Sequence, residues 1–414
     1  IINAQDLSTA QHIDANAGWS WISFNLASND MSIFSALDYL EPSSGDQFIN
    51  FNDGQFLSYS AIQQEWVGSP EFENINNKYM YQLKLTNSDE LTFIGLEVDP
   101  SSNIIPYEDG WNWMAYSPQR TMEIDAALSN LNGSHIDLIK GRFGFAEYVN
   151  NIGWIGSLTS MHPGQGYMLN ANTDGSFTYN HSDILSRSTF YINNDIENIQ
   201  MLHTSVGLNS TQYQHTMSAI VQVPSNESLF EDVSNSDLKL IAYEDYNVRG
   251  VSEITYFEKI SEELAFLNIY GNDTNEKISI RILNELTGEE YLTDFQYRFE
   301  KDAIMGNVDS PIVLSNIRPA IPDNYSLSQN YPNPFNPSTT VEFQIPEDSF
   351  VSLKVYNLMG QEITTLKSEF MNAGYGHAIW DGVDENGMSV STGIYFVKME
   401  TPKYSKVRKM LFLK

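Results

Sequence analysis

The stretch that most restricts the fold lies near the C-terminal end, where residues 330–337 read Asn-Tyr-Pro-Asn-Pro-Phe-Asn-Pro. Proline fixes φ at about −65° and has no backbone N–H to donate. Three prolines in six residues therefore exclude a helix, and they also exclude a central strand of a sheet. The sequence predicts that this stretch is a stiff, extended segment leading into a β-domain.

The residues after the prolines form short runs separated by glycine turns. Apolar and polar side chains alternate over 350–357, as they do in a half-buried strand. Further strand-like runs occupy 363–366, 394–399 and 406–414, and a polar, glycine-containing loop covers 381–387. Short strands at this spacing predict a small antiparallel sandwich.

Several motifs of this region occur together and in a fixed order: YPNPFNPSTT, VSLKVYNLMGQE, AGYGHAIWDGVDENG, STGIYFVKM and KVRKMLFLK. Over residues 322–414 the chain resembles the C-terminal sorting domain of the type IX secretion system. The resemblance implies export across the outer membrane of Bacteroidetes-related bacteria, with the secretion machinery as partner. It also implies that the domain is often removed afterwards, and that the cargo is released or attached to surface lipopolysaccharide. The signal is carried here by Tyr331, Pro332, Asn333, Pro334, Phe335, Asn336, Pro337, Gly360, Gly374, Trp380, Asp381, Gly382, Gly393, Lys406, Lys409 and Lys414.

The charge distribution separates this C-terminal end from the rest of the chain. The net charge is −31, which disfavours nucleic acid and anionic membranes as partners. Residues 398–414 nevertheless hold six Lys or Arg and one acid. A basic last strand could contact an acidic receptor, or its lysines could protect a sheet edge from aggregation. Both interpretations stay open.

The composition also restricts the chemistry and the location of the protein. The sequence contains no cysteine, which excludes disulfides and thiolate metal sites. No apolar run approaches the roughly 18 residues of a membrane span, and the first residues do not read as a signal peptide. Because the type IX route starts with export to the periplasm, the resemblance implies that a leader has been removed. We expect a secreted protein, extracellular or on the outer cell surface.

Two segments of the N-terminal half are alike. Gly-Trp-Ser-Trp at 18–21 recurs as Gly-Trp-Asn-Trp at 110–113, and helical patterns follow at 31–40 and 122–131. The offset of about 90 residues is too long for a solenoid unit and predicts a duplicated small domain. The pattern also resembles uncharacterised tandem β-modules of type IX cargo proteins, a resemblance that implies no activity.

These observations predict a mainly β, multidomain chain, in which tandem small β-rich (α+β) repeats precede immunoglobulin-like β-sandwich domains. Alternating runs between 201 and 314 favour the first such sandwich. The expected boundaries are 1–102 and 103–183 for the repeats, 184–200 for a linker, 201–314 for the sandwich, 315–323 for a second linker and 324–414 for the sorting domain.

Six tryptophans of the repeats are candidate binding residues. Trp19 and Trp21 share one face of a strand, as do Trp111 and Trp113. Such a pair can stack on sugar rings, or it can form the core against the following helix. The duplication favours the core. Two further tryptophans next to Gly-Ser, Trp66 and Trp154, are expected near a loop surface.

The polar residues indicate no catalytic site, no cofactor and no metal centre. Asp381, Asp384 and Asn386 have alternate oxygen spacing, but the bidentate acid that ends a calcium loop is missing. Glu244 and Asp245 could contribute to a cation site. No two histidines have the i, i+4 spacing of a helical metal pair.

The sequence therefore predicts a non-enzymatic protein with an adhesive or structural role, acting through contacts with other surface proteins or glycans. A carbohydrate-binding or accessory protein of a polysaccharide-degrading system is the first alternative. An enzyme whose site is assembled from distant residues is the second, because such sites need no local motif.

Overall fold

A computed structural model describes residues 8–180, 194–224, 230, 233–245, 247–322 and 324–413. The chain is mainly β and forms several separate sheets, which confirms the predicted fold class. It divides into two compact units. The first contains Ile1–Ser225, Leu240–Ser279 and Gln296–Leu314, and the second contains Asn226–Lys239, Ile280–Phe295 and Ser315–Lys414. No helix in the described part of the chain is both long and apolar enough to cross a membrane.

The two repeats lie in the first unit and have the same topology. Their five-stranded sheets have the orders β2-β7-β4-β5-β6 and β10-β16-β12-β13-β14, and strands β1 and β9 pair with β8 and β17. The first repeat consists of β1 (Thr9–Ala15), β2 (Gly18–Ser23), β3 (Leu26–Ala27), α1 (Ile33–Leu37), β4 (Gln47–Asn50), β5 (Gln55–Ser60), β6 (Glu65–Gly68), β7 (Met80–Leu85) and β8 (Asp89–Glu97). The second consists of β9 (Ile105–Tyr107), β10 (Gly110–Ala115), β11 (Met122–Glu123), α2 (Ile124–Ala127), β12 (Leu138–Lys140), β13 (Phe145–Val149), β14 (Gly153–Gly156), β15 (Ser160–Met161), β16 (Gly166–Ala171) and β17 (Gly175–Phe177).

Each repeat has its own core, and equivalent aromatic residues occupy it. The rings of Phe24 and Phe93 meet edge-on at 5.3 Å in the first repeat, and those of Tyr116 and Tyr179 meet edge-on at 5.1 Å in the second. Edge-on contacts of buried rings add to the stabilisation from apolar burial. The two helices are shorter than the patterns predicted, and α1 begins where the Ser32 hydroxyl accepts a hydrogen bond from the Ser35 amide.

The next module contains two five-stranded sheets. Their orders are β21-β22-β18-β25, with β26 also paired to β18, and β20-β19-β23-β24-β27. The division between the two compact units runs through β19, β23 and β24. The elements are α3 (Asn194–Ser205), η2 (Ser210–Gln212), β18 (His215–Gln222), η4 (Asn235–Asp237), β19 (Leu238–Glu244), β20 (Asn247–Glu253), β21 (Thr255–Phe257), β22 (Glu262–Gly271), β23 (Lys277–Asn284), β24 (Glu290–Arg298), β25 (Ile304–Met305), β26 (Ile312–Val313) and β27 (Arg318–Pro319).

The connection expected over 184–200 lies partly outside the described residues. Its last part, from Asn194, is the beginning of α3 rather than irregular chain.

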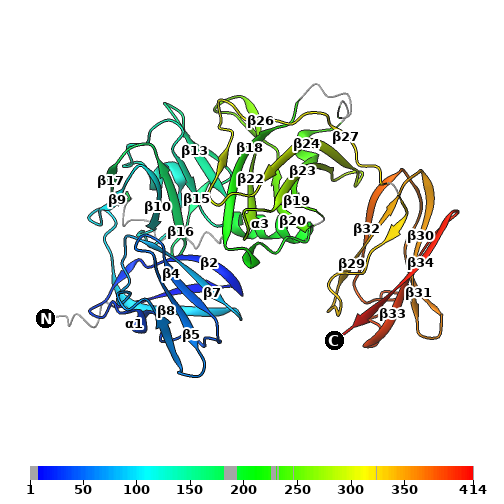
Figure 1. Cartoon of the computed structure of the whole chain (residues 1–414), viewed down its shortest axis with the longest axis horizontal. Coiled ribbons are helices and arrows are strands. Elements are labelled where there is room, and N and C mark those ends of the chain that lie inside the picture. The colour runs from blue at the N-terminus through cyan, green and yellow to red at the C-terminus, as the bar shows by residue number, and fades with distance from the viewer. Residues whose placement is uncertain are drawn as a thin grey trace. The chain divides into compact units, whose positions relative to one another are not determined.

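The C-terminal region forms the predicted antiparallel sandwich. One sheet has the order β28-β29-β32, and the other has the order β31-β30-β33-β34. Figure 1 shows this region in yellow to red. Alternating side chains of both sheets, such as Phe343 and Val397, are fully or almost fully buried in one core. The strands are β28 (Ser326–Leu327), β29 (Thr339–Ile345), β30 (Ser349–Asn357), β31 (Glu362–Met371), β32 (Gly374–Trp380), β33 (Gly393–Thr401) and β34 (Tyr404–Phe412).

Candidate functional site

The second tryptophan of each Gly-Trp-x-Trp strand lies where the two repeats meet. β2 and β10 are edge strands of their sheets. The rings of Trp21 and Trp113 stack with their centroids 6.4 Å apart, and Met80 and Met168 complete a cluster of four buried side chains. Because the residues of each pair are equivalent in the two repeats, the repeats contact each other through the same surface. We call these four residues the repeat seam.

The backbones of the two repeats also contact each other directly at the repeat seam. The Ser23 amide donates to the Gly164 carbonyl at 2.9 Å, and the Ala115 amide donates to the Lys78 carbonyl at 3.0 Å. A Cβ atom at Gly166 would lie 2.5 Å from Cβ of Met80, closer than real side chains approach. A glycine is therefore needed at this position for the two sheets to come together.

The first tryptophan of each pair carries a lysine on its ring face. The Lys84 ammonium lies 5.6 Å from the ring centroid of Trp19, and the Lys140 ammonium lies 4.3 Å from that of Trp111. Trp19 is buried, whereas Trp111 is half-buried. These are cation–π contacts, which gain strength when the pair is shielded from water.

The remaining two tryptophans of the repeats belong to the cores. Trp66 and Trp154 are 9% and 6% exposed, and each meets a tyrosine edge-on, Tyr59 or Tyr148. The expectation that they lie near a loop surface is wrong, because the strands that carry them turn these side chains inward. The packing of the six tryptophans favours the core interpretation, while glycan binding stays a prediction.

A buried ion pair connects the second repeat to the following module. The Lys140 ammonium has no exposed surface and lies 2.8 Å from Oδ1 of Asp302. Burial lowers the pKa of Lys140, because it disfavours the charged form, and Asp302 opposes this shift. The sequence did not indicate this pair, since Lys140 and Asp302 are 162 residues apart and no local motif links them.

Arg142, two residues later, is buried in the same region. It donates through Nη2 to the backbone carbonyls of Ser210 and Tyr213, and its guanidinium faces the rings of Trp21 and Tyr270. Burial lowers the pKa of Arg142 to about 10. Its contacts reach both the repeat seam and the sandwich module, so they also join modules of the first unit.

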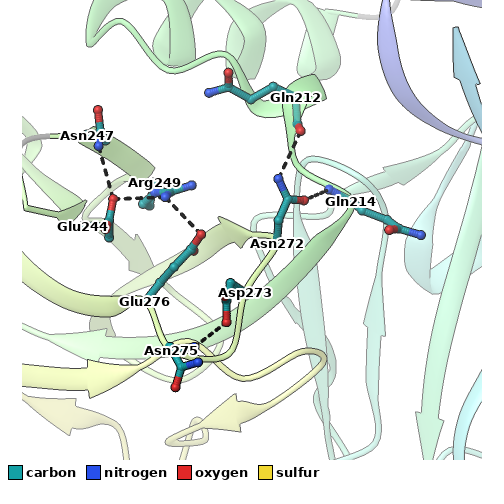
Figure 2. A network of polar contacts seen from close by, with 9 residues as sticks. All are labelled: Gln212, Gln214, Glu244, Asn247, Arg249, Asn272, Asp273, Asn275 and Glu276. Atoms are coloured by element: carbon teal, nitrogen blue, oxygen red, sulfur yellow. Dashed lines mark hydrogen bonds and ion pairs between the residues drawn. The ribbon is translucent and has the colours of Figure 1, made fainter. Parts of the chain in front are cut away.

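A polar network in the sandwich module is built around Arg249 (Figure 2). Its Nη2 lies 3.1 Å from Oε2 of Glu244 and 3.1 Å from Oε1 of Glu276, and the guanidinium stacks over the Tyr213 ring at 4.4 Å. Hydrogen bonds from Asn247 and Arg249 lower the pKa of Glu244, whereas burial raises the pKa of Glu276. The guanidinium of Arg249 occupies the position between the two carboxylates in which a metal cation would have to bind.

The other half of the network fixes the loop between β22 and β23. Oδ1 of Asn272 accepts from the Gln214 amide at 2.8 Å, and Asp273 accepts from the Asn275 amide at 2.9 Å (Figure 2). The Asn272 side-chain amide also donates to the Gln212 carbonyl at 3.4 Å. Among the residues with described positions, no group of three His, Asp or Glu is placed to hold a metal ion.

In the C-terminal sandwich, the proline-rich segment lies along the last strand. The Asn333 side-chain oxygen accepts from the Leu411 amide at 2.9 Å, and the Phe335 amide donates to the Leu411 carbonyl at 3.0 Å. The Leu413 amide in turn donates to the Phe335 carbonyl at 3.0 Å. β34 is an edge strand, so these bonds satisfy part of an edge that would otherwise be open to pairing with another chain.

An aromatic cluster anchors the same segment. Phe335 is the buried side chain among exposed prolines, and its ring packs against Phe412 at 4.9 Å and Trp380 at 5.4 Å. Trp380 donates through Nε1 to the Val383 carbonyl at 2.9 Å. Gly382 has a φ of +67°, and a Cβ atom there would lie 2.7 Å from the Phe412 ring. Two features therefore require a glycine at position 382: the positive φ and the close approach of the Phe412 ring.

The other residues of the predicted signal lie at turns or on the surface. Gly360 has a φ of +77° in the turn between β30 and β31. The remaining members are Gly374, which begins β32, Gly393, which begins β33, and the exposed Tyr331, Pro332, Pro334, Asn336, Pro337, Asp381, Lys406 and Lys409. Lys414 lies outside the described residues. Outside the predicted signal, the calcium-loop candidate Asp384 accepts a hydrogen bond from the Asn386 amide as a turn residue.

The contact of Asn333 with β34 gives a direct stability prediction. Asn333→Ala removes the acceptor of the Leu411 amide, so we expect a loss of about 1 kcal/mol in the free energy of unfolding of the sandwich. For a domain of this size the midpoint falls by roughly 4–8 °C. Calorimetry of the full chain measures the change. The control is Asn336→Ala, an exposed asparagine of the same motif, and an equal loss in both variants would contradict the role of Asn333.

Comparisons with known proteins identify only the C-terminal region. Residues 329–413 match the family model of the secretion system C-terminal sorting domain, and no curated protein matches the chain significantly. The solved structure of dimeric latent PorU from Porphyromonas gingivalis is 10% identical, has a TM-score of 0.19, and is matched over 78% of this chain and 35% of that chain.

A second solved structure is similarly distant. PorZ of Porphyromonas gingivalis, described as an essential bacterial surface component of the type IX secretion system, is 11% identical with a TM-score of 0.18, over 88% of this chain and 44% of that chain. This chain thus spans less than half the length of either protein, and likeness at this level says nothing about its function. Residues 329–413 form a secretion system C-terminal sorting domain, which indicates a protein secreted by the type IX system to the cell surface or the extracellular space.

Proposed function

We propose that the chain is a non-enzymatic surface protein with an adhesive or structural role, and that its first unit acts as a rigid scaffold. The observation that carries this proposal is the repeat seam, in which Trp21 and Trp113 stack and both repeats are tied by backbone bonds. Lys140 and Arg142 extend the joint to the sandwich module. Buried contacts of this kind hold modules in one arrangement, which suits a protein that presents surfaces to partners.

The alternatives have less support. A glycan-binding platform needs accessible rings, yet Trp21 and Trp113 are 2% and 7% exposed and cover each other. The strongly shifted pKa values of the first unit belong to buried groups, among them tyrosines such as Tyr81. Burial lowers the pKa of Arg142 to about 10 and the pKa of His203 to about 4. Burial in the repeat cores accounts for the shifts of the tyrosines, and burial between modules accounts for that of Arg142, so they give the enzyme interpretation little weight.

Two linked experiments in a type IX-competent host test the proposal. Deletion of 324–414 should abolish surface delivery, measured by immunolabelling of intact cells, and unchanged delivery would contradict the export assignment.

The second experiment tests adhesion. Beads coated with the full chain should adhere to cells of the host. Beads coated with an unrelated protein of similar negative charge should not. Equal retention of the two kinds of bead would contradict the adhesive role.

A further inference from the structure

A hollow of about 520 Å³ lies between the second repeat and the sandwich module, away from the repeat seam. Four segments of the first unit line it: the end of β13 with the turn after it, the end of β18 at Gln222, the turn between β21 and β22 with the start of β22, and residues 308–311. Its volume is within the roughly 300–1,000 Å³ typical of ligand sites. None of the candidate residues from the sequence lines it.

Six of the ten residues that line this hollow are apolar, and the other four are polar or charged. Val149, Leu264 and Val308 are buried and belong to one hydrophobic cluster shared by the two modules. Ile152 and Ile260 are partly buried and pack against the same cluster. Because the first three side chains are already buried, the apolar surface that a partner could cover is mainly that of Ile152, Ile260 and Pro311, and covering it gains free energy.

Polar contacts of three lining residues hold the hollow in shape. The Val308 amide donates to Oε1 of the buried Glu147 at 2.9 Å. The neighbouring Asp309 lies 2.6 Å from Nε2 of His135, and Lys259 lies 2.9 Å from Asp125. Because these contacts already fix the lining segments, a partner would lose little free energy to ordering them.

The rim of the hollow is acidic. Glu262 and Asp309 both line it, and Gln222 donates to Oε2 of Glu262 at 3.1 Å. The positive charge of Lys259 is offset by its ion pair with Asp125. The chain as a whole carries a net charge of −31, which adds to the attraction for a cation.

We propose that this hollow binds a peptide segment of a protein partner, with apolar side chains on its floor and a lysine or arginine at Glu262 and Asp309. This inference deepens the proposed function and rests on it, because it names the chemistry of the protein that the scaffold contacts. An apolar floor with a charged rim is the usual composition of a peptide-binding surface. An acidic glycan would be repelled by the same negative charges.

The test uses the full chain and a fluorescent eight-residue peptide of alternating lysine and valine, with binding followed by anisotropy. The variant Glu262→Gln/Asp309→Asn removes both rim charges but keeps side chains of the same size. We expect it to bind the peptide about tenfold more weakly than the parent chain. The peptide with glutamate in place of lysine should not bind.

A matched control separates the hollow from the general negative field. Glu73→Gln/Glu108→Gln removes the same number of charges from exposed positions elsewhere in the repeats, and it should leave the affinity within twofold. Equal weakening in both variants, or no binding by the parent chain, would overturn the proposal. If coated beads adhere to cells but the peptide does not bind, the proposed function stands and only the assignment of the hollow fails.

Discussion

Replacement of Arg249 by methionine is expected to lower the free energy of unfolding of the first unit by about 3–5 kcal/mol. The change leaves Glu244 and Glu276 close together without the guanidinium that lies 3.1 Å from each of them. Burial already disfavours the charged form of Glu276 and raises its pKa, and the charge of Arg249 opposes that shift. Urea unfolding of the full chain, followed by tryptophan fluorescence, measures the loss.

The pH dependence of this variant follows from the same geometry. Without Arg249 the folded state raises the pKa of Glu276 further, so the folded chain binds a proton that the unfolded chain releases. The loss in the free energy of unfolding, relative to the parent chain, should therefore be largest at neutral pH. It should become smaller as pH falls through the raised pKa of Glu276. Adding Glu244→Gln and Glu276→Gln to Arg249→Met should recover most of the loss. A deficit independent of pH would contradict the assigned role of the arginine.

The second large effect is expected at the ion pair between Lys140 and Asp302. Asp302→Asn leaves a fully buried ammonium without its carboxylate, and we expect a loss of about 3–5 kcal/mol. Lys140→Met should lose less, because the Asp302 side chain is 16% exposed and Lys301 lies 4.0 Å away. Denaturant unfolding of both variants measures the difference.

The sign of the pH dependence distinguishes this pair from Arg249. In Asp302→Asn the carboxylate no longer opposes the effect of burial, so the pKa of Lys140 falls further below its usual value. The unfolded chain then binds more protons than the folded chain. Stability should then rise as pH increases through the lowered pKa. The double variant Lys140→Met/Asp302→Asn should be close to the parent chain, since neither charge remains. A double variant as unstable as Asp302→Asn would contradict this account.

Much of the architecture could be predicted from the sequence because it is encoded locally. The two Gly-Trp-x-Trp segments at 18–21 and 110–113 predicted a duplication, and the two sheets have the same strand order. The short strand-like runs after residue 350 and the glycine turns between them predicted the sandwich, and the prolines of 330–337 predicted the extended segment before it, because proline restricts the backbone whatever surrounds it.

The contacts between modules could not be predicted in the same way. Period-two spacing places Trp19 and Trp21 on one face of a strand, but it does not say what covers that face. Lys140 and Arg142 flank Gly141 in a turn pattern that is typical of solvent, yet both are buried because another module packs over them. The prediction for Trp66 and Trp154 was wrong for a different reason: both lie in the core of their own repeat, and a neighbouring Gly-Ser does not fix the direction of a side chain.

Acrylamide quenching of tryptophan fluorescence in the full chain distinguishes a buried joint between modules from an exposed binding surface. Six of the seven tryptophans are buried and Trp111 is half-buried, so quenching should be several-fold weaker in the folded chain than in guanidinium. Added oligosaccharides should not change it. Strong quenching of the folded chain that an oligosaccharide relieves would contradict the interpretation as a buried joint, because the tryptophans would then be a binding surface and not the joint between modules.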